Sequence, residues 1–197
     1  MTGEVRLQAD GGDAAIARVT LSHPGKLNAM SRAMWIALRE VFQAIQADTR
    51  WRCVVLAGEG EAFCAGGDIS EYPDFRFDEG ALRHFHEVEV WGGLSALLAC
   101  DVPVVAAIRG PCMGAGVEIA SCCDIRLAAD TATFGAPIAR LGFPMADREA
   151  RLVARAVGDL TAREMLLMAA TLDAAQMQQR GFLNQVLPAA DLAARAS

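Results

Sequence analysis

The sequence predicts an α/β domain built from units of strand, glycine turn and helix, whose strands stack in parallel while the helices lie outside. Buried-strand patterns at 53–56 and 102–108 are each followed directly by a glycine-rich stretch. The segments VVLAGEGEAFCAGGDI, from Val54, and VVAAIRGPCMGAGVEI, from Val104, share the order strand, glycine turn, acid, isoleucine. This similarity indicates that one kind of unit is used at least twice.

The first elements are a hairpin and a helix. Strand-like runs at Glu4–Ala9 and Ala14–Leu21 flank the turn sequence DGGD at 10–13. Ser31 is a suitable N-cap, and apolar residues follow it at helical spacing to about residue 47. We therefore expect an antiparallel pair followed by an amphipathic helix over 31–47.

The later elements follow from the same patterns. We expect a strand at 53–56, a glycine loop at 58–68, a helix over 79–99, a strand at 102–108, a glycine stretch at 109–118 that leads into a helix ending near 123, a strand at 124–128, a turn at 134–137, and helices at 148–158 and 161–170. No segment between 1 and 170 has a linker composition, so a single domain over 1–197 is predicted.

Composition excludes several classes of protein. With 197 residues, 53% of them hydrophobic and 21% charged, the chain can bury one full core, which excludes disorder and coiled coil. The 18 glycines are scattered and prolines number 7, which excludes collagen-like and low-complexity chains. Arg, Asp or Gly interrupts the apolar stretches before the roughly 20 residues that a spanning helix needs, so no membrane association is expected.

Charge and cysteine content set further expectations. The net charge is −6 and Lys26 is the only lysine, so nucleic-acid binding through a basic face is disfavoured. The N-terminus has no apolar stretch typical of a secretory signal, and we expect a cytoplasmic protein. Its six cysteines are then interpreted mainly as small buried hydrophobic residues and not as disulfides.

Glycine turns after buried strands expose backbone N–H groups and so favour an anion. A P-loop requires GxxxxGK[ST], which Lys26 does not complete. A dinucleotide fingerprint is weak, because Ile119 stands where the third glycine after Gly114 and Gly116 belongs. Two similar turns that each give one N–H to a single oxygen fit a divided oxyanion hole.

Several motifs together resemble the crotonase superfamily, the enoyl-CoA hydratases and isomerases. They are HPGKLNAM at 23–30, AFCAGGDI at 62–69, the stretch 110–120, CDIR at 123–126, FGAP at 134–137 and GFLNQV at 181–186. The resemblance implies a crotonase-like spiral of ββα units that forms an acyl-CoA-binding core domain. It also implies an acyl-CoA thioester as partner, and a homotrimer or dimer of trimers. Since relatives continue past the last motif, the resemblance implies that the C-terminal helical part is short or absent here.

The resemblance also assigns site residues. The oxyanion hole would consist of the amides of Gly67 and Ala115, and Glu118 falls at the first of the family's two catalytic glutamate positions. Ala115 replaces the usual glycine, which is acceptable if its backbone is not left-handed. The residues expected along the coenzyme A are Lys26, Leu27, Ala65, Asp68 and Ile69, with adenine recognised mainly by backbone groups.

The second catalytic glutamate position holds Ile138, which argues against an ordinary hydratase because hydration usually divides proton transfer between two carboxylates. Asp147 or Glu149 could replace the missing acid, but acids at the start of a helix are favoured there in any case. A further hypothesis gives the missing proton transfer to His84 or His86.

The predicted function is that of an enoyl-CoA hydratase/isomerase-family enzyme, in which Glu118 is the acid/base that acts on a stabilised enolate. The alternatives are a thioester hydrolase, a decarboxylase and a non-catalytic CoA-thioester binding protein. No cofactor is expected beyond the coenzyme A of the substrate. No metal is expected either, because Cys122-Cys123 lacks CxxC spacing and His84 and His86 diverge around a helix. Cys64 has no recognisable base beside it, and is interpreted as packing.

Overall fold

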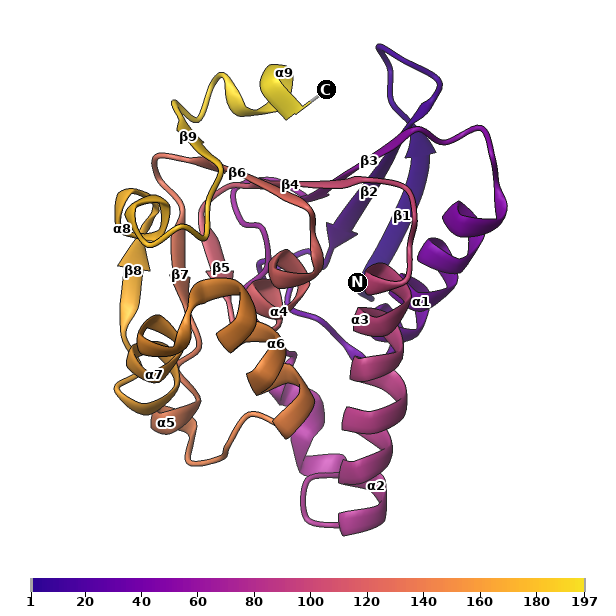
Figure 1. Cartoon of the computed structure of the whole chain (residues 1–197). Coiled ribbons are helices and arrows are strands. Elements are labelled where there is room, and N and C mark those ends of the chain that lie inside the picture. The colour runs from indigo at the N-terminus through magenta and orange to yellow at the C-terminus, as the bar shows by residue number, and fades with distance from the viewer. Residues whose placement is uncertain (1, 197) are drawn as a thin grey trace.

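A computed structural model describes residues 2–196 of the chain. It shows a six-stranded main sheet with helices on both faces (Figure 1). The strand order is β1 (Glu4–Ala9), β2 (Ile16–Ser22), β3 (Cys53–Gly58), β4 (Val104–Ile108), β6 (Ile125–Ala129) and β9 (Gln185–Leu187). Only β1 and β2 are antiparallel; the other neighbours pair in parallel. The predicted hairpin and parallel strands are therefore confirmed.

A second, smaller sheet crosses the helical side of the main one. It consists of β5 (Pro111–Met113), β7 (Thr133–Gly135) and β8 (Thr171–Asp173). The turn predicted at 134–137 is wrong in its first half, because Phe134 pairs with Cys112 on one side and with Leu172 on the other. Tertiary pairing thus makes a strand from a sequence that has local turn chemistry.

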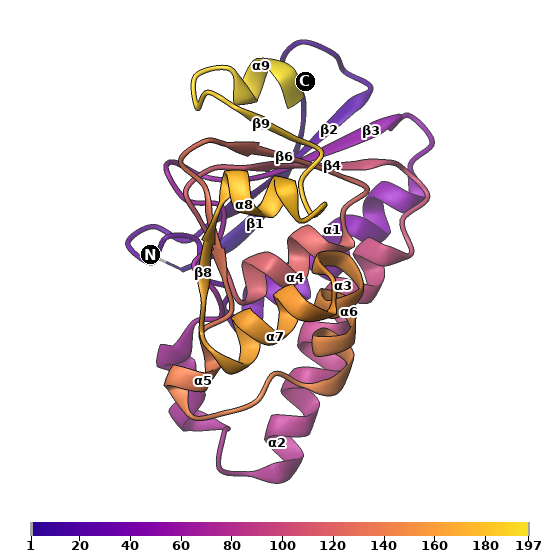
Figure 2. The ribbon, with the colours of Figure 1, turned by 60° about the vertical axis from the view of Figure 1, so that its left-hand side comes forward.

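Helices cover the two faces of the main sheet unequally (Figures 1 and 2). Those on one face, with the short helices beyond them, are α1 (Arg32–Ala47), the 3-10 helix η1 (Ile69–Asp74), α2 (Glu79–His84), the π-helix η2 (Phe85–Val90), α3 (Trp91–Leu98), α4 (Ala115–Cys122), α5 (Ile138–Leu141), α6 (Asp147–Val157), α7 (Asp159–Leu167) and α8 (Ala174–Gln179). On the opposite face α9 (Leu192–Ala196) packs against residues such as Val55 and Ala107. The large hydrophobic core lies between the sheet and the first group.

The long predicted helices are present, with one local difference. Ser31 caps α1 by accepting a hydrogen bond from the Met34 amide, 3.3 Å away. The helix predicted over 79–99 runs from Glu79 to Leu98 but contains the π-helical segment η2, in which the Trp91 amide bonds five residues back to the His86 carbonyl. Gly158, at φ 84°, separates α6 from α7.

The two glycine turns of the repeated unit meet each other. The Met113 amide donates a hydrogen bond to the Cys64 carbonyl over 2.8 Å. The backbones of Cys64 and Cys112 form an isolated parallel β-bridge. A side chain at Gly116 would place its Cβ 2.7 Å from the Cys64 carbonyl oxygen, so only glycine allows α4 to start this close. The parallel register of β3 and β4 thus brings both turns to one place.

Two further observations concern the helices and the cysteines. None of its helices within residues 2–196 is long and apolar enough to cross a membrane. All six cysteines are free thiols; Cys53 and Cys100 are half-buried and the others are buried.

Candidate active site

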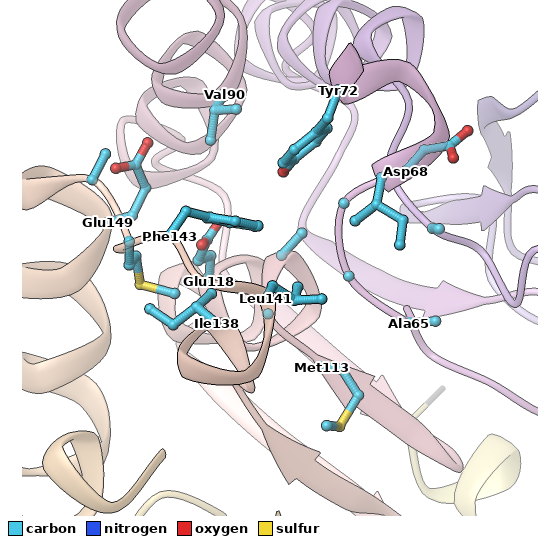
Figure 3. A pocket seen from close by; sticks show the side chains of 18 of the residues that line it. Ala65, Asp68, Tyr72, Val90, Met113, Glu118, Ile138, Leu141, Phe143 and Glu149 are labelled. Carbon is cyan, nitrogen blue, oxygen red and sulfur yellow. The ribbon is translucent and has the colours of Figure 1, made fainter. Parts of the chain in front are cut away.

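A cavity of about 440 Å³ lies where the two glycine turns meet. Figure 3 shows it between the turn that carries Asp68, η1 with Tyr72, and the segment from Ile138 to Glu149. The predicted site residues that line it are Lys26, Ala65, Gly67, Asp68, Ile69, Ala115, Glu118 and Ile138. The cavity therefore gathers residues from five separate parts of the chain.

Leu27 is the predicted site residue that does not line the cavity. Its side chain is 57% exposed, and its carbonyl accepts a hydrogen bond from the Ala65 amide over 3.0 Å. Leu27 therefore lies beside another predicted coenzyme A contact, on the exposed surface of the loop between β2 and α1.

Backbone geometry leaves the amides of Gly67 and Ala115 available. Met30 binds the neighbours of Gly67, donating to the Gly66 carbonyl and accepting from the Asp68 amide, each over 2.8 Å. The isolated Met30–Gly67 β-bridge therefore uses the Gly66 carbonyl and the Asp68 amide, and the Gly67 amide is not part of it. Ala115 is the first residue of α4, where amides have no partner within the helix. Its backbone is helical and not left-handed, as a side chain there requires.

Glu118 is a buried acid in the cavity wall. It lies in the first turn of α4 and is 8% exposed. Burial, followed by the negative charge of Glu149, raises its pKa from the ordinary 4.5 to about 8. A carboxyl that titrates near neutral pH can both give and take a proton, which is the property of an acid/base catalyst.

The mouth of the cavity holds a paired charge. The Lys26 ammonium donates to Asp68 Oδ2 over 2.6 Å and to Ser70 Oγ over 2.8 Å. Burial alone would raise the pKa of Asp68, but the hydrogen bonds that Asp68 accepts from Lys26 and Ser70 outweigh burial, and the pKa is lowered. Lys26 retains 43% of its side-chain surface and so stays accessible to a ligand.

The inner wall is mainly apolar. Ile138 begins α5, and with Val90, Leu141 and Phe143 it surrounds the end of the cavity at which Glu118 lies (Figure 3). Trp35 also contributes to this wall, and its buried indole N–H has no hydrogen-bond partner among residues 2–196.

A second buried carboxylate, Glu149, lines the same end of the cavity. It is 2% exposed, and its Oε1 lies 3.5 Å from His86 Nδ1, which also lines the cavity. His84 points elsewhere, with its Nε2 3.6 Å from Glu89 Oε1. Asp147 is exposed and pairs with Arg151. Of the substitutes considered from sequence, the structure brings Glu149 and His86 to the site.

Sequence reasoning treated Glu149 as a helix-terminal charge and did not single out Tyr72. The buried stripe of α6 consists of residues spaced four apart: Glu149, Val153 and Val157. An acid at helical spacing from two apolar residues is the sequence pattern that indicates its burial. Tyr72 directs its hydroxyl into the cavity (Figure 3), and a Cβ on Gly67 would lie 2.8 Å from that oxygen. Burial, then the charges of Glu118 and Glu149, raise its pKa to about 12.

Other candidate residues have structural surroundings. Burial raises the pKa of Cys64 to about 12, which leaves no thiolate for nucleophilic attack. The Asp124 carboxylate accepts a hydrogen bond from the Val104 amide, 2.8 Å away, which gives Asp124 a structural role. Within residues 2–196, no three His, Cys, Asp or Glu side chains are grouped as a metal site would need.

Comparisons with known proteins place the chain in a family. The family model for enoyl-CoA hydratase/isomerase matches residues 11–197. A "probable enoyl-CoA hydratase" of Mycobacterium bovis is 32% identical over 180 residues, which are 91% of this chain and 68% of the relative. The 2,3-dehydroadipyl-CoA hydratase of Escherichia coli is 33% identical over 171 residues, which are 86% of this chain and 65% of that relative. The chain thus spans about two thirds of these relatives' length.

Solved structures agree with the fold. An enoyl-CoA hydratase/carnithine racemase from Magnetospirillum magneticum superposes with a TM-score of 0.92 at 36% identity, covering 99% of this chain and 72% of that one. DspI of Pseudomonas aeruginosa superposes with a TM-score of 0.89 at 27% identity, covering 99% and 72%. The predicted crotonase-like α/β fold is confirmed, and the chain belongs to the enoyl-CoA hydratase/isomerase family of the crotonase superfamily.

Proposed function

We propose that the chain moves a proton at the carbon beside the carbonyl of an acyl-CoA thioester, as an enoyl-CoA hydratase or isomerase. The observation that carries this proposal is the position of buried Glu118 one helical turn after the Ala115 amide, in a cavity that the Gly67 residue also lines. The two amides would donate hydrogen bonds to the thioester oxygen as it gains charge in the enolate. One such donor is worth about 3 kcal/mol of transition-state stabilisation in other enzymes.

Glu118 would exchange the proton with the α carbon. Its pKa of about 8 means that both protonation states are populated near neutral pH. A protonated Glu118 can deliver a proton to the enolate when water adds, and an ionised Glu118 can remove one when a double bond moves.

The coenzyme A part of the substrate would pass Lys26 and Leu27 and continue along Ala65, Asp68 and Ile69. Lys26 is held by Asp68 and Ser70, which fixes its position for a phosphate of the ligand. The acyl group would point toward the apolar wall around Ile138, which favours an apolar acyl group.

Incubation with 2-enoyl-, 3-enoyl-, saturated and malonyl-type CoA thioesters, followed by mass spectrometry, tests the proposal. We expect a 3-hydroxyacyl product from a 2-enoyl substrate, or movement of the double bond. A free acid would instead indicate a hydrolase and loss of carbon dioxide a decarboxylase. Binding of every thioester without turnover would show a binding protein and end the enzyme proposal.

We also propose that the chain forms a homotrimer or a dimer of trimers. Leu160, Leu167 and Met168, on and next to α7, are between 70% and 76% exposed, and an assembly could cover them. Light scattering on the purified chain measures its mass directly, and a monomer at micromolar concentration would contradict this proposal.

A further inference from the structure

Besides the Trp35 indole N–H, two polar groups in the inner wall of the cavity are buried without hydrogen-bond partners in the described chain, residues 2–196. They are Glu149 Oε2 and His86 Nδ1. A buried carboxylate oxygen that lacks a partner is costly, and such an atom in a native fold requires an explanation. Simple helix capping does not supply one, because Glu149 is 2% exposed and is directed into the interior of the fold.

Glu149 lies at the same end of the cavity as Glu118. Figure 3 shows both carboxylates there, with Ile138 and Phe143 beside them. The elements that carry the two acids, α4 and α6, pack against each other. The charge of Glu149 also contributes, after burial, to the raised pKa of Glu118. The inner end therefore holds two carboxylates although position 138 is isoleucine.

His86 and Glu149 also separate two cavities. A second hollow of about 400 Å³ shares His86, Ala146 and Glu149 with the first. Its other walls carry charged groups, several of them on exposed side chains: Glu79 and Arg83 of α2, Glu87 of η2, and Asp147 and Arg148 of α6. The pair thus has the acyl cavity on one side and a solvent-facing hollow on the other.

We propose that Glu149 is the second proton-transfer residue of the site, in place of the carboxylate absent at Ile138, and that His86 connects it to the solvent-facing hollow. This rests on the proposed function. When water adds, its oxygen bonds to the β carbon while ionised Glu149 takes its proton, and protonated Glu118 gives a proton to the α carbon. The proton on Glu149 then leaves through His86 to water, and Glu118 regains one from water.

The charged and titratable groups around the pair come from every element packed on it. Glu118 faces it from α4 and Tyr72 from η1, while the groups of the outer hollow face it from α2, η2 and α6. Arg148 is drawn toward Trp91, with its guanidinium 5.6 Å from the ring centre. Of these groups in residues 2–196, only His86 forms an ion pair with Glu149, with 3.5 Å between its Nδ1 and Glu149 Oε1.

Two reactions separate the roles of Glu118 and Glu149. Exchange of the α hydrogen of a saturated acyl-CoA with deuterated water needs the oxyanion hole and Glu118, whereas water addition to a 2-enoyl-CoA also needs Glu149. We expect Glu149→Gln to lower kcat for hydration by about 100-fold or more, with KM little changed, while α exchange stays within about tenfold of the parent. Glu118→Gln should lose both reactions.

His86→Gln tests the connection to solvent. Because His86 acts through Glu149, this variant should lower kcat for hydration by about tenfold and alter its pH profile, with KM unchanged. Asp159→Asn is the matched control, since Asp159 also lies in the first turn of a helix but is 71% exposed, pairs with Arg163 and lines neither cavity; both reactions should stay within about twofold.

Three outcomes overturn the proposal. The first is Glu149→Gln hydrating at the parental rate. The second is Glu149→Gln and Glu149→Asp losing exchange and hydration to the same extent, which indicates a structural role. The third is a parent chain that exchanges α hydrogens but hydrates no enoyl-CoA, which leaves the enolate chemistry of Glu118 standing. A parent chain inert in both reactions instead contradicts the proposed function itself.

Discussion

The two ends of the cavity treat charge in opposite ways. At the mouth, Lys26, Asp68 and Ser70 bind one another at 2.6–2.8 Å, and each charge has a partner. At the inner end, Glu118 is buried with a pKa near 8 and Glu149 has an oxygen without a partner in residues 2–196. Paired charges fix a loop in place at little cost, whereas poorly paired buried charges are retained for chemistry. We therefore assign binding to the mouth and proton transfer to the inner end.

The largest effect is expected from Glu118→Gln. The amide keeps the shape of the side chain but cannot exchange a proton, so turnover should fall by about 1,000-fold or more while CoA-thioester affinity changes little. Steady-state kinetics and calorimetric binding measure the two effects. Glu61→Gln, with a side chain 86% exposed, is the control. A variant with unchanged turnover would remove Glu118 from the mechanism.

Ala115→Pro removes one amide donor from the inner end. Proline is tolerated at the first position of a helix, where Ala115 lies, so the fold should survive while the N–H is lost. We expect kcat to fall by about 100-fold to 1,000-fold. Ala115→Gly keeps the amide and should retain activity. Circular dichroism verifies the fold, and a folded proline variant with full activity would exclude this donor.

Stability should depend on pH through Glu118. Since its pKa is raised from 4.5 to about 8 on folding, the unfolded state binds fewer protons than the folded state between these values. The free energy of unfolding contributed by Glu118 should therefore fall by about 1.4 kcal/mol per pH unit as pH rises through this window, and level off above it. Urea unfolding of the parent minus that of Glu118→Gln isolates the slope, and parallel curves would contradict the burial of an ionisable acid.

The smallest effect is expected at the mouth. Lys26→Met removes a partly exposed ammonium, so KM for the CoA thioester should rise about threefold while kcat stays the same. Arg52→Met, an exposed cation at the start of β3, is the control for net charge. A fall in kcat equal to the rise in KM would mean that the mouth also takes part in the chemistry and would weaken the distinction between the two ends.

The sequence predicted the parts of the site that local patterns encode. Glycine turns after buried strands indicated where Gly67 and Ala115 lie, and motif spacing indicated Glu118; all three line the cavity. Their proposed roles stay predictions. The role of Glu149 could not be read locally, because an acid in a first helical turn looks the same whether that turn faces water or a cavity. Only the packing of α6 on α4 decides between them.

The fold shows the same division. The hairpin, the parallel strands and the long helices follow from periodicity, as the match of α1 to its predicted range shows. The strand at Phe134 and the π-helical segment η2 do not, because each depends on neighbours distant in sequence. The segment η1, with Tyr72, likewise has no strong periodic signal.

The π-helical segment η2 sets the rotational phase of the helix on either side of it. An α-helix turns by about 100° per residue, and a π turn contains one residue more than an α turn. The segment therefore lets α3 pack on α1 while His86, several residues earlier, still lines the cavity. Deleting one residue within Phe85–Val90 would restore α-helical phase and rotate the preceding turns by about 100° relative to α3. A one-residue deletion could thus move the His86 imidazole out of the cavity although the histidine itself is kept.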